Sequence, residues 1–341
     1  MSPFKKRIKQ FAKKLPIIKD LIAERDRLRT ENAAIRSESD AIRCESDAIR
    51  SECDAIRHEL EDLKRLQGFV PPGHFYSPIP DINELQNIDG EFIGCTSKKI
   101  PGVELNDDEQ LELLKRFSGF YREMPFQAEK QEGLRYYFEN PAYSYSDAIL
   151  LHCMIRHLKP NRIIEVGSGF SSCMILDTND LFFDGSLATT FIEPYPELLM
   201  SLIGDPDQDR IEIIPSRLQD VDLSKFDELE ENDILFIDST HVSKINSDVN
   251  RIFFDVLPRL STGVHVHFHD IFFPFEYPRE WLLEGRAWNE AYMLKAFLQF
   301  NHAFHPVLMN TYMTNFHESF FEENMPLCLK NTGASIWLKR I

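Results

Sequence analysis

The stretch that decides the fold reads Ile163-Ile164-Glu165-Val166-Gly167-Ser168-Gly169-Phe170-Ser171-Ser172. A short apolar run is followed by two glycines one residue apart and then by a segment with helical patterning. Gly167 and Gly169 let the backbone approach a ligand without a Cβ clash, and the N-terminus of the helix beyond offers free N–H groups. The pattern predicts a buried strand that turns into a helix at a ligand site.

Apolar runs and helical segments alternate on both sides of this stretch. Strands are expected at 162–166, 188–192, 210–214, 234–237, 264–268, 307–312 and 334–338, with helices at 146–157, 171–177, 196–203, 243–257 and 287–300. Apolar strands joined by helical crossovers are typical of a parallel sheet that is covered on both faces. We therefore expect an α/β fold, a Rossmann-like doubly wound and mostly parallel seven-stranded sheet that ends in a hairpin.

A seven-residue repeat precedes this domain. Residues 34–57 repeat the pattern A-I-R-x-E-x-D, and apolar residues recur every seventh position from Leu21 to Leu63. A sustained seven-residue period predicts a left-handed α-helical coiled coil, here with Asn32 at a core position that fixes register. We expect a homo-oligomer through this coil, and a lone solvated helix is the alternative.

The N-terminal end is basic and amphipathic. Residues 1–19 carry seven cations and no acid, and Phe4, Ile8, Phe11 and Leu15 recur at three- and four-residue steps. Such a helix can lie on an anionic membrane surface, so peripheral membrane contact by residues 1–19 is a prediction, with an ordinary solvated helix end as the alternative. Pro16 is expected to break or kink the helix.

Three regions follow from these patterns. Residues 1–67 are the basic segment and coiled coil, 68–137 are a Pro-rich linker and lead-in or cap, and 138–341 are the α/β domain. The 341 residues are 43% apolar and 27% charged, with a net charge of −17, and such an acidic surface disfavours nucleic acid. Six cysteines without a C-x-x-C pair and no apolar run long enough for a membrane span lead us to expect a cytoplasmic protein.

The acid two residues before the first glycine decides the ligand class. Glu165 would repel a pyrophosphate and attract an ammonium group, and Ser172 stands where a dinucleotide site needs a third glycine. Both features disfavour a nicotinamide-dependent oxidoreductase. The stretch resembles the first motif, E-x-G-x-G, of the class I S-adenosylmethionine-dependent methyltransferases.

Further positions fit the same family over residues 138–341. Glu193 ends the second strand, the loop 216–220 follows the third, and Asp238 ends the fourth. The resemblance implies that a set of seven residues binds S-adenosylmethionine: Glu165, Gly167, Ser168, Gly169, Glu193, Arg217 and Asp238. In the family the acid after the second strand binds the ribose. A Rossmann-like domain for another ligand remains the alternative.

Two acids end adjacent strands. Asp238 and Asp270 follow the fourth and fifth strands, and facing carboxylates can hold a hard divalent cation. In similar O-methyltransferases acids at these strand ends bind magnesium, so Mg²⁺ at Asp238 and Asp270 is an expectation. His269 departs from those enzymes, several of which have an acid there. The alternative is that both acids only position the cofactor or the acceptor.

The catalytic candidates are His241, His269 and Asp270. An aliphatic hydroxyl is a poor nucleophile until its proton is removed, and neutral imidazole titrates near the working pH. We expect His241 or His269 to be the general base, and His265 and His267 to be structural.

An aromatic run follows Asp270, D-I-F-F-P-F-E-Y-P-R-E-W, and then W-N-E at 288–290. It resembles a sub-branch of the class I family that is associated with bacterial cell-surface glycans and natural-product O-methylation. The rings could stack on a sugar, with Arg279, Glu280 and Asn289 as polar anchors, or form a lid that packs on the core. The resemblance implies an O-methyltransferase acting on a small-molecule or glycan acceptor. The alternative is a non-catalytic scaffold with a methyltransferase-like fold.

Overall fold

The computed structural model describes residues 3–66, 68–87 and 97–341. Residues 1–2 of the predicted basic segment and residues 67 and 88–96, at the coil end and in the linker, lie outside this part. The chain divides into two units, residues 1–77 and 78–341, which are described separately. The region boundaries at 67 and 137 stay predictions.

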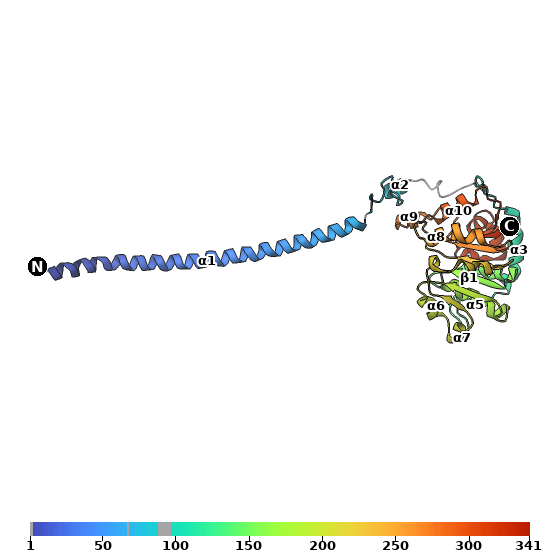
Figure 1. The fold of residues 1–341 in the computed structure, drawn as a ribbon, viewed down its shortest axis with the longest axis horizontal. Coiled ribbons are helices and arrows are strands. Elements are labelled where there is room, and N and C mark those ends of the chain that lie inside the picture. The colour runs from blue at the N-terminus through green and yellow to red at the C-terminus, as the bar shows by residue number, and fades with distance from the viewer. Residues whose placement is uncertain (1–2, 67, 88–96) are drawn as a thin grey trace. The chain divides into compact units, whose positions relative to one another are not determined.

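The first unit contains one long helix, α1 (Pro3–Leu66), of 64 residues. Figure 1 shows it as a single element, and Pro16 lies inside it, so the expected break is wrong. A proline lacks one N–H and its ring crowds the carbonyl four residues earlier, but the helical hydrogen bonds on either side can persist. The seven-residue stripe is exposed along α1. The helix is confirmed, and the coiled coil stays a prediction.

Within the described ranges, no helix combines the length and the apolar character that crossing a bilayer requires.

The second unit is built on one seven-stranded sheet. Its strands are β1 (Arg162–Val166), β2 (Ala188–Ile192), β3 (Glu212–Ile214), β4 (Ile234–Ile237), β5 (His265–His269), β6 (Phe304–Met309) and β7 (Ser335–Arg340). Their order is β3-β2-β1-β4-β5-β7-β6; the first five run parallel, and β7 is antiparallel to both β5 and β6. The predicted fold class is confirmed. The strand order reverses between β1 and β4, and open α/β sheets bind ligands at such a point.

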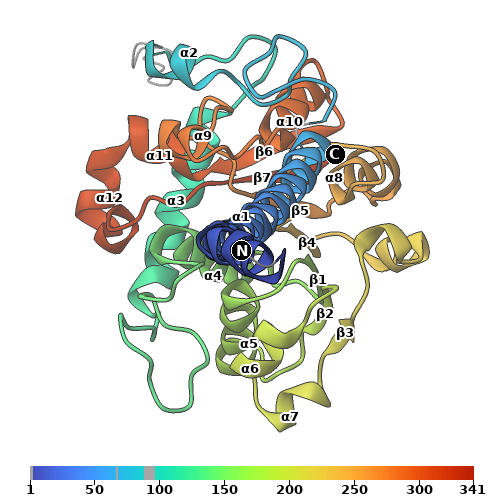
Figure 2. The same ribbon diagram turned by 90° about the vertical axis from the view of Figure 1, so that its left-hand side faces the viewer.

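Helices cover both faces of this sheet. Figure 2 shows α3, α4 and α5 on one side and α8 on the other. The helices of this unit are α2 (Ile82–Asn87), α3 (Asp107–Arg122), α4 (Tyr145–Leu158), α5 (Phe170–Phe182), α6 (Glu197–Leu202), α7 (Asp205–Gln208), α8 (Asp248–Arg251), α9 (Arg279–Leu283), α10 (Glu290–Leu298), α11 (Asn310–Phe316) and α12 (Glu318–Asn324). 3₁₀ turns lie at Leu218–Asp220, Leu223–Glu228, Leu257–Arg259 and Pro326–Leu329, and a π turn at Ile252–Val256.

Two predicted elements are displaced. The strand expected at 307–312 lies at Phe304–Met309, and α11 begins at Asn310, whose amide donates to the buried Asp147 carboxylate (2.7 Å). The helix expected at 243–257 begins only at Asp248. The Ser247 hydroxyl accepts the Asn250 N–H and thereby caps this helix at its observed start.

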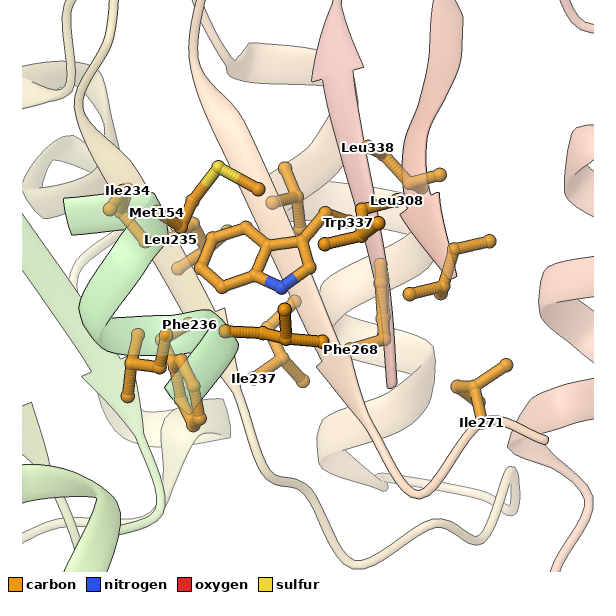
Figure 3. Close-up of a cluster of buried hydrophobic side chains, with 14 of the residues drawn as sticks. Met154, Ile234, Leu235, Phe236, Ile237, Phe268, Ile271, Leu308, Trp337 and Leu338 are labelled. Carbon is orange, nitrogen blue, oxygen red and sulfur yellow. The ribbon is translucent and has the colours of Figure 1, made fainter. Parts of the chain in front are cut away.

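The core of this unit surrounds Trp337 of β7, which is fully buried. Figure 3 shows its indole beside Met154 of α4, among apolar side chains of β4, β5 and β6. Neighbouring elements therefore hold the carboxyl ends of β4 and β5 in fixed positions, where the candidate site lies.

Candidate functional site

The turn between β1 and α5 is shaped by Gly167. Its φ is +84°, and a Cβ there would lie 2.3 Å from the backbone oxygen of Asp238 after β4. Only glycine fits such an approach. A Cβ on Gly169 would meet only Leu198 Cδ2, at an ordinary 3.5 Å. The protein's own packing thus requires glycine at 167 and does not require it at 169.

Glu165 holds this turn from inside. Its side chain is fully buried; Oε1 accepts the Ser171 hydroxyl (2.5 Å) and Oε2 accepts the Ser172 hydroxyl (2.6 Å). Ser172 Oγ in turn accepts the Gly169 N–H (3.1 Å). Burial raises the pKa of Glu165 to about 8, against the lowering effect of the two hydroxyls. Both oxygens of Glu165 thus bind the start of α5, and the expected contact of Glu165 with the ligand's ammonium group stays a prediction.

Ser168 stands between the two glycines. Its hydroxyl oxygen is buried, and it has no hydrogen-bond partner among the described residues. A buried hydroxyl without a partner costs free energy unless something else bonds to it. It lies beside the N-terminus of α5, where helical N–H groups favour negative charge. The turn therefore has the donors that the carboxylate of an amino acid needs.

Glu193 and Arg217 follow β2 and β3 on the same edge of the sheet. Glu193 is partly exposed, and its Oε1 accepts the Tyr195 N–H (2.8 Å). Its Oε2 makes no hydrogen bond within the described chain and can accept ligand hydroxyls. Arg217 is exposed and pairs with Asp220 (2.8 Å). The predicted cofactor residues thus lie along the ends of β1 to β4.

A polar cluster lies at the ends of β4 and β5, with His241 at its centre. The Nδ1 atom of His241 donates to Glu290 Oε2 (2.8 Å). Its Nε2 lies 3.5 Å from Asp238 Oδ1 and 3.6 Å from Asp270 Oδ2. Glu290 begins α10, is buried, and accepts the Ser239 hydroxyl with its other oxygen (2.9 Å). Sequence reasoning brought three of these residues together and missed the role of Glu290.

The charges in this cluster favour a protonated His241. Although burial favours the neutral ring, Asp238 and Glu290 raise the pKa of His241 to about 10. Burial raises the pKa of Asp270, and the nearby His269 and His241 only partly oppose this. Burial also works against the charge of Asp238, yet His269 and His241 hold its pKa below the usual value. These neighbours favour a proton on His241 near neutral pH, and its role as general base stays a prediction.

The histidines of β5 have two kinds of surroundings. His269 is mostly buried, with Nε2 3.6 Å from Asp270 Oδ1. Burial disfavours its charge, but Asp238 and Asp270 raise its pKa above the usual value. His267 lies in the core with its ring stacked on Phe236, at 4.1 Å between ring centroids. Burial lowers the pKa of His267 far below the usual value. The structural interpretation of His267 agrees with this position.

The ends of β4 and β5 are also the place where a magnesium site was expected. Asp238 and Asp270 do end adjacent strands, but the His241 ring nitrogen lies between their carboxylates, within 3.6 Å of an oxygen of each. Among residues 3–66, 68–87 and 97–341, no three His, Cys, Asp or Glu side chains are arranged to hold a metal ion. An imidazolium already supplies positive charge between the two acids, so these residues do not fit a divalent cation.

The aromatic run divides between core and surface. Phe273, Phe275 and Tyr277 are buried, as the lid alternative predicts for part of the run. Trp281 and Trp288 are half-buried with ring centroids 5.2 Å apart, and the Arg286 guanidinium lies 4.3 Å above the Trp281 ring. Trp288 also lies 4.3 Å from the His241 ring. These two indoles are therefore next to the polar cluster.

The polar anchors predicted in this run have different surroundings. The Asn289 side-chain oxygen accepts the Ser243 N–H (2.6 Å), and its backbone N–H donates to the His241 carbonyl (3.0 Å). Asn289 thus fixes the loop that carries His241, and its expected contact with the acceptor stays a prediction. Arg279 is partly buried and Glu280 is exposed in the first turn of α9.

The chain is similar in sequence to known proteins. Residues 164–271 match a protein family described as a methyltransferase domain. The chain is 37% identical over 165 residues to an uncharacterised protein of Archaeoglobus fulgidus. The matched region covers 48% of this chain and 74% of that protein.

Solved structures with a similar fold have low sequence identity to the chain. The S-adenosylhomocysteine-bound methyltransferase PaMTH1 of Podospora anserina is 15% identical, with a TM-score of 0.38, and the match covers 78% of this chain and 99% of that one. The O-methyltransferase TomG of Streptomyces achromogenes is involved in tomaymycin synthesis and was solved with S-adenosylmethionine. It is 14% identical, with a TM-score of 0.39, and the match covers 76% of this chain and 97% of that one.

Proposed function

Because the chain belongs to the class I S-adenosylmethionine-dependent methyltransferases, we propose that it transfers a methyl group from S-adenosylmethionine to a hydroxyl of a sugar or glycan intermediate. One observation carries this proposal. The backbone of Gly167 packs directly against Asp238, so the glycine turn adjoins the His241 cluster. A cofactor at the turn would thus have its reactive end beside groups that can act on an acceptor.

The cofactor half of the site suits an amino acid linked to a nucleoside. The buried Ser168 hydroxyl and the N-terminus of α5 can bond the carboxylate of the amino acid. Glu193, with one oxygen available, can accept the ribose hydroxyls. Gly169 has no packing reason to be glycine, and close approach of the cofactor provides one. When bound, S-adenosylmethionine supplies a methyl group on a positively charged sulfur.

The other half of the site can take up the proton. Transfer forms a C–O bond, breaks the C–S bond and releases one proton from the acceptor hydroxyl. His241 already holds a proton, whereas Asp270 is a carboxylate whose pKa is raised by burial, and a raised pKa makes it a stronger base. Asp270 accepts the proton in our proposal, with His269 as its neighbour at 3.6 Å. The His241 imidazolium stabilises the negative oxygen as it forms.

The acceptor would lie over the two half-buried indoles. Trp281 and Trp288 present aromatic faces next to His241, and Arg286 adds hydrogen-bond donors beside them. Sugars offer apolar C–H faces and hydroxyl rims, which such a surface can stack and bond. This supports a glycan acceptor over a small apolar one.

The test is transfer of labelled methyl from S-adenosylmethionine to a panel of sugars and glycan intermediates. We expect a product that carries the label in an O-methyl ether group, and Asp270→Asn should lower kcat at least about 100-fold while S-adenosylhomocysteine still binds. Asp255→Asn, a partly exposed acid paired with Arg251, is the matched control and should keep full activity. Methylation of amines only, or full activity of Asp270→Asn, would contradict the proposal.

A further inference from the structure

Helix α1 carries an exposed apolar stripe that the chemistry above does not use. Its members recur every seven residues, and their side chains are 46–64% exposed: Leu21, Leu28, Ile35, Ile42, Ile49, Ile56 and Leu63. Apolar residues at this spacing keep one seam in line along a supercoiled helix. Taken as d positions, they define the other positions of every heptad.

The residues on the two sides of the stripe have opposite charge. The g positions are all acidic: Glu24, Glu31, Glu38, Glu45, Glu52 and Glu59. The e positions that follow them are all basic: Arg29, Arg36, Arg43, Arg50, Arg57 and Lys64. All of them are exposed on α1. Six successive heptads therefore repeat one charge pattern without an exception.

This pattern selects both the partner and its direction. In a parallel coiled coil a g residue of one helix faces the e residue of the next heptad on the other, so Glu38 would face Arg43 of a second copy. In an antiparallel pair, g faces g and e faces e, and every such contact would join like charges. We propose that α1 forms a parallel, in-register coiled coil with a second copy of this chain. This inference does not depend on the proposed function.

The a positions contribute little to the choice between parallel and antiparallel pairing, so the charges at e and g decide it. They include Arg25, Asn32, Ser39 and Ser46, which add little apolar contact to the seam. Cys53 is also an a residue, so in register it meets the same residue of the second copy. Cys44 is an f residue on the side away from the seam. Both thiols are exposed and free, which gives a reporter and its control on the same helix.

The first test is mild oxidation of the full chain, followed by electrophoresis without reductant. A disulfide needs Cα atoms within about 7 Å, which the parallel in-register arrangement supplies at position 53. We expect a covalent dimer in the wild type and in Cys44→Ser, and at least a tenfold loss of it in Cys53→Ser. Equal cross-linking in both variants, or none in the wild type, would overturn the register.

The second test exchanges charges and measures association by sedimentation equilibrium. The E38R/E45R variant should associate at least tenfold more weakly than wild type, and so should R43E/R50E, because each places like charges across the seam. Mixing the two variants should restore association as a heterodimer. The control D40R/D47R makes the same charge change at outward b positions and should stay within threefold of wild type. A control as weak as E38R/E45R, or a mixture that stays apart, would overturn the proposal.

Discussion

Replacing the two glycines of the β1–α5 turn one at a time separates what the fold needs from what the ligand needs. An alanine at 167 would place its Cβ 2.3 Å from the Asp238 backbone oxygen and hold a left-handed φ of +84°. The left-handed conformation costs roughly 1–2 kcal/mol and overpacking about 1–3 kcal/mol more. Gly167→Ala should therefore lose about 2–5 kcal/mol of the roughly 5–15 kcal/mol that stabilises a domain.

The assay is thermal unfolding followed by tryptophan fluorescence. All three tryptophans, Trp281, Trp288 and Trp337, belong to the unit 78–341, so α1 does not contribute to the signal. At about 2–4 °C per kcal/mol, Gly167→Ala should lower Tm by roughly 4–20 °C. Gly169→Ala meets only Leu198 at ordinary contact distance and should keep the wild-type Tm within a few degrees.

Ligand affinity should change in the variant that keeps its stability. We expect Gly169→Ala to bind S-adenosylhomocysteine at least about tenfold more weakly, equivalent to 1.4 kcal/mol, because its methyl group enters the space of the cofactor. If Gly167→Ala melted like wild type, the fold would not need glycine at 167. If Gly169→Ala kept full affinity for S-adenosylhomocysteine, the cofactor would not lie against residue 169.

Three other results are expected. Glu193→Ala should weaken S-adenosylhomocysteine binding about tenfold at unchanged Tm, measured by equilibrium dialysis, and unchanged affinity would mean that the ribose lies elsewhere. The stability from charged His241 is complete below about pH 6.5 and is lost as pH rises through its folded-state pKa of about 10. Between pH 8 and 10, above the pKa of Glu165, the Tm of wild type should therefore fall more steeply than that of Glu290→Gln, and parallel curves would contradict this. Turnover in EDTA should stay within about twofold of turnover without it, because the His241 ring lies between Asp238 and Asp270. A loss of turnover that Mg²⁺ restores would show that a metal ion displaces the His241 ring.

The sequence predicted the sheet and the convergence of its strand ends for one physical reason. Parallel strands end at the same edge of a sheet, so Asp238 after β4 and Asp270 after β5 must approach each other once β4 and β5 pair. The glycine turn was equally local, because its two glycines and the following helix are contiguous in sequence. These parts of the site could therefore be predicted before any contact was known.

What the sequence could not predict depends on contacts that form only when the elements fold and pack. Glu290 lies 49 residues beyond His241, and only the packing of α10 against the loop after β4 brings them within 2.8 Å. The orientation of Glu165 was missed because Ser171 and Ser172 reach it only once α5 has formed its first turn. The signal for Glu290 was a lone acid at the predicted start of a helix, which usually only complements the helix dipole.

Isothermal titration of the full chain with S-adenosylhomocysteine measures whether the β1–α5 turn and Glu193 form the site for the methyl donor. We expect saturable binding with one site per chain, and the same experiment on Glu193→Ala should give weaker binding at the same stoichiometry. A wild-type chain that shows no binding at millimolar ligand, while its tryptophan-monitored unfolding remains cooperative, would contradict it.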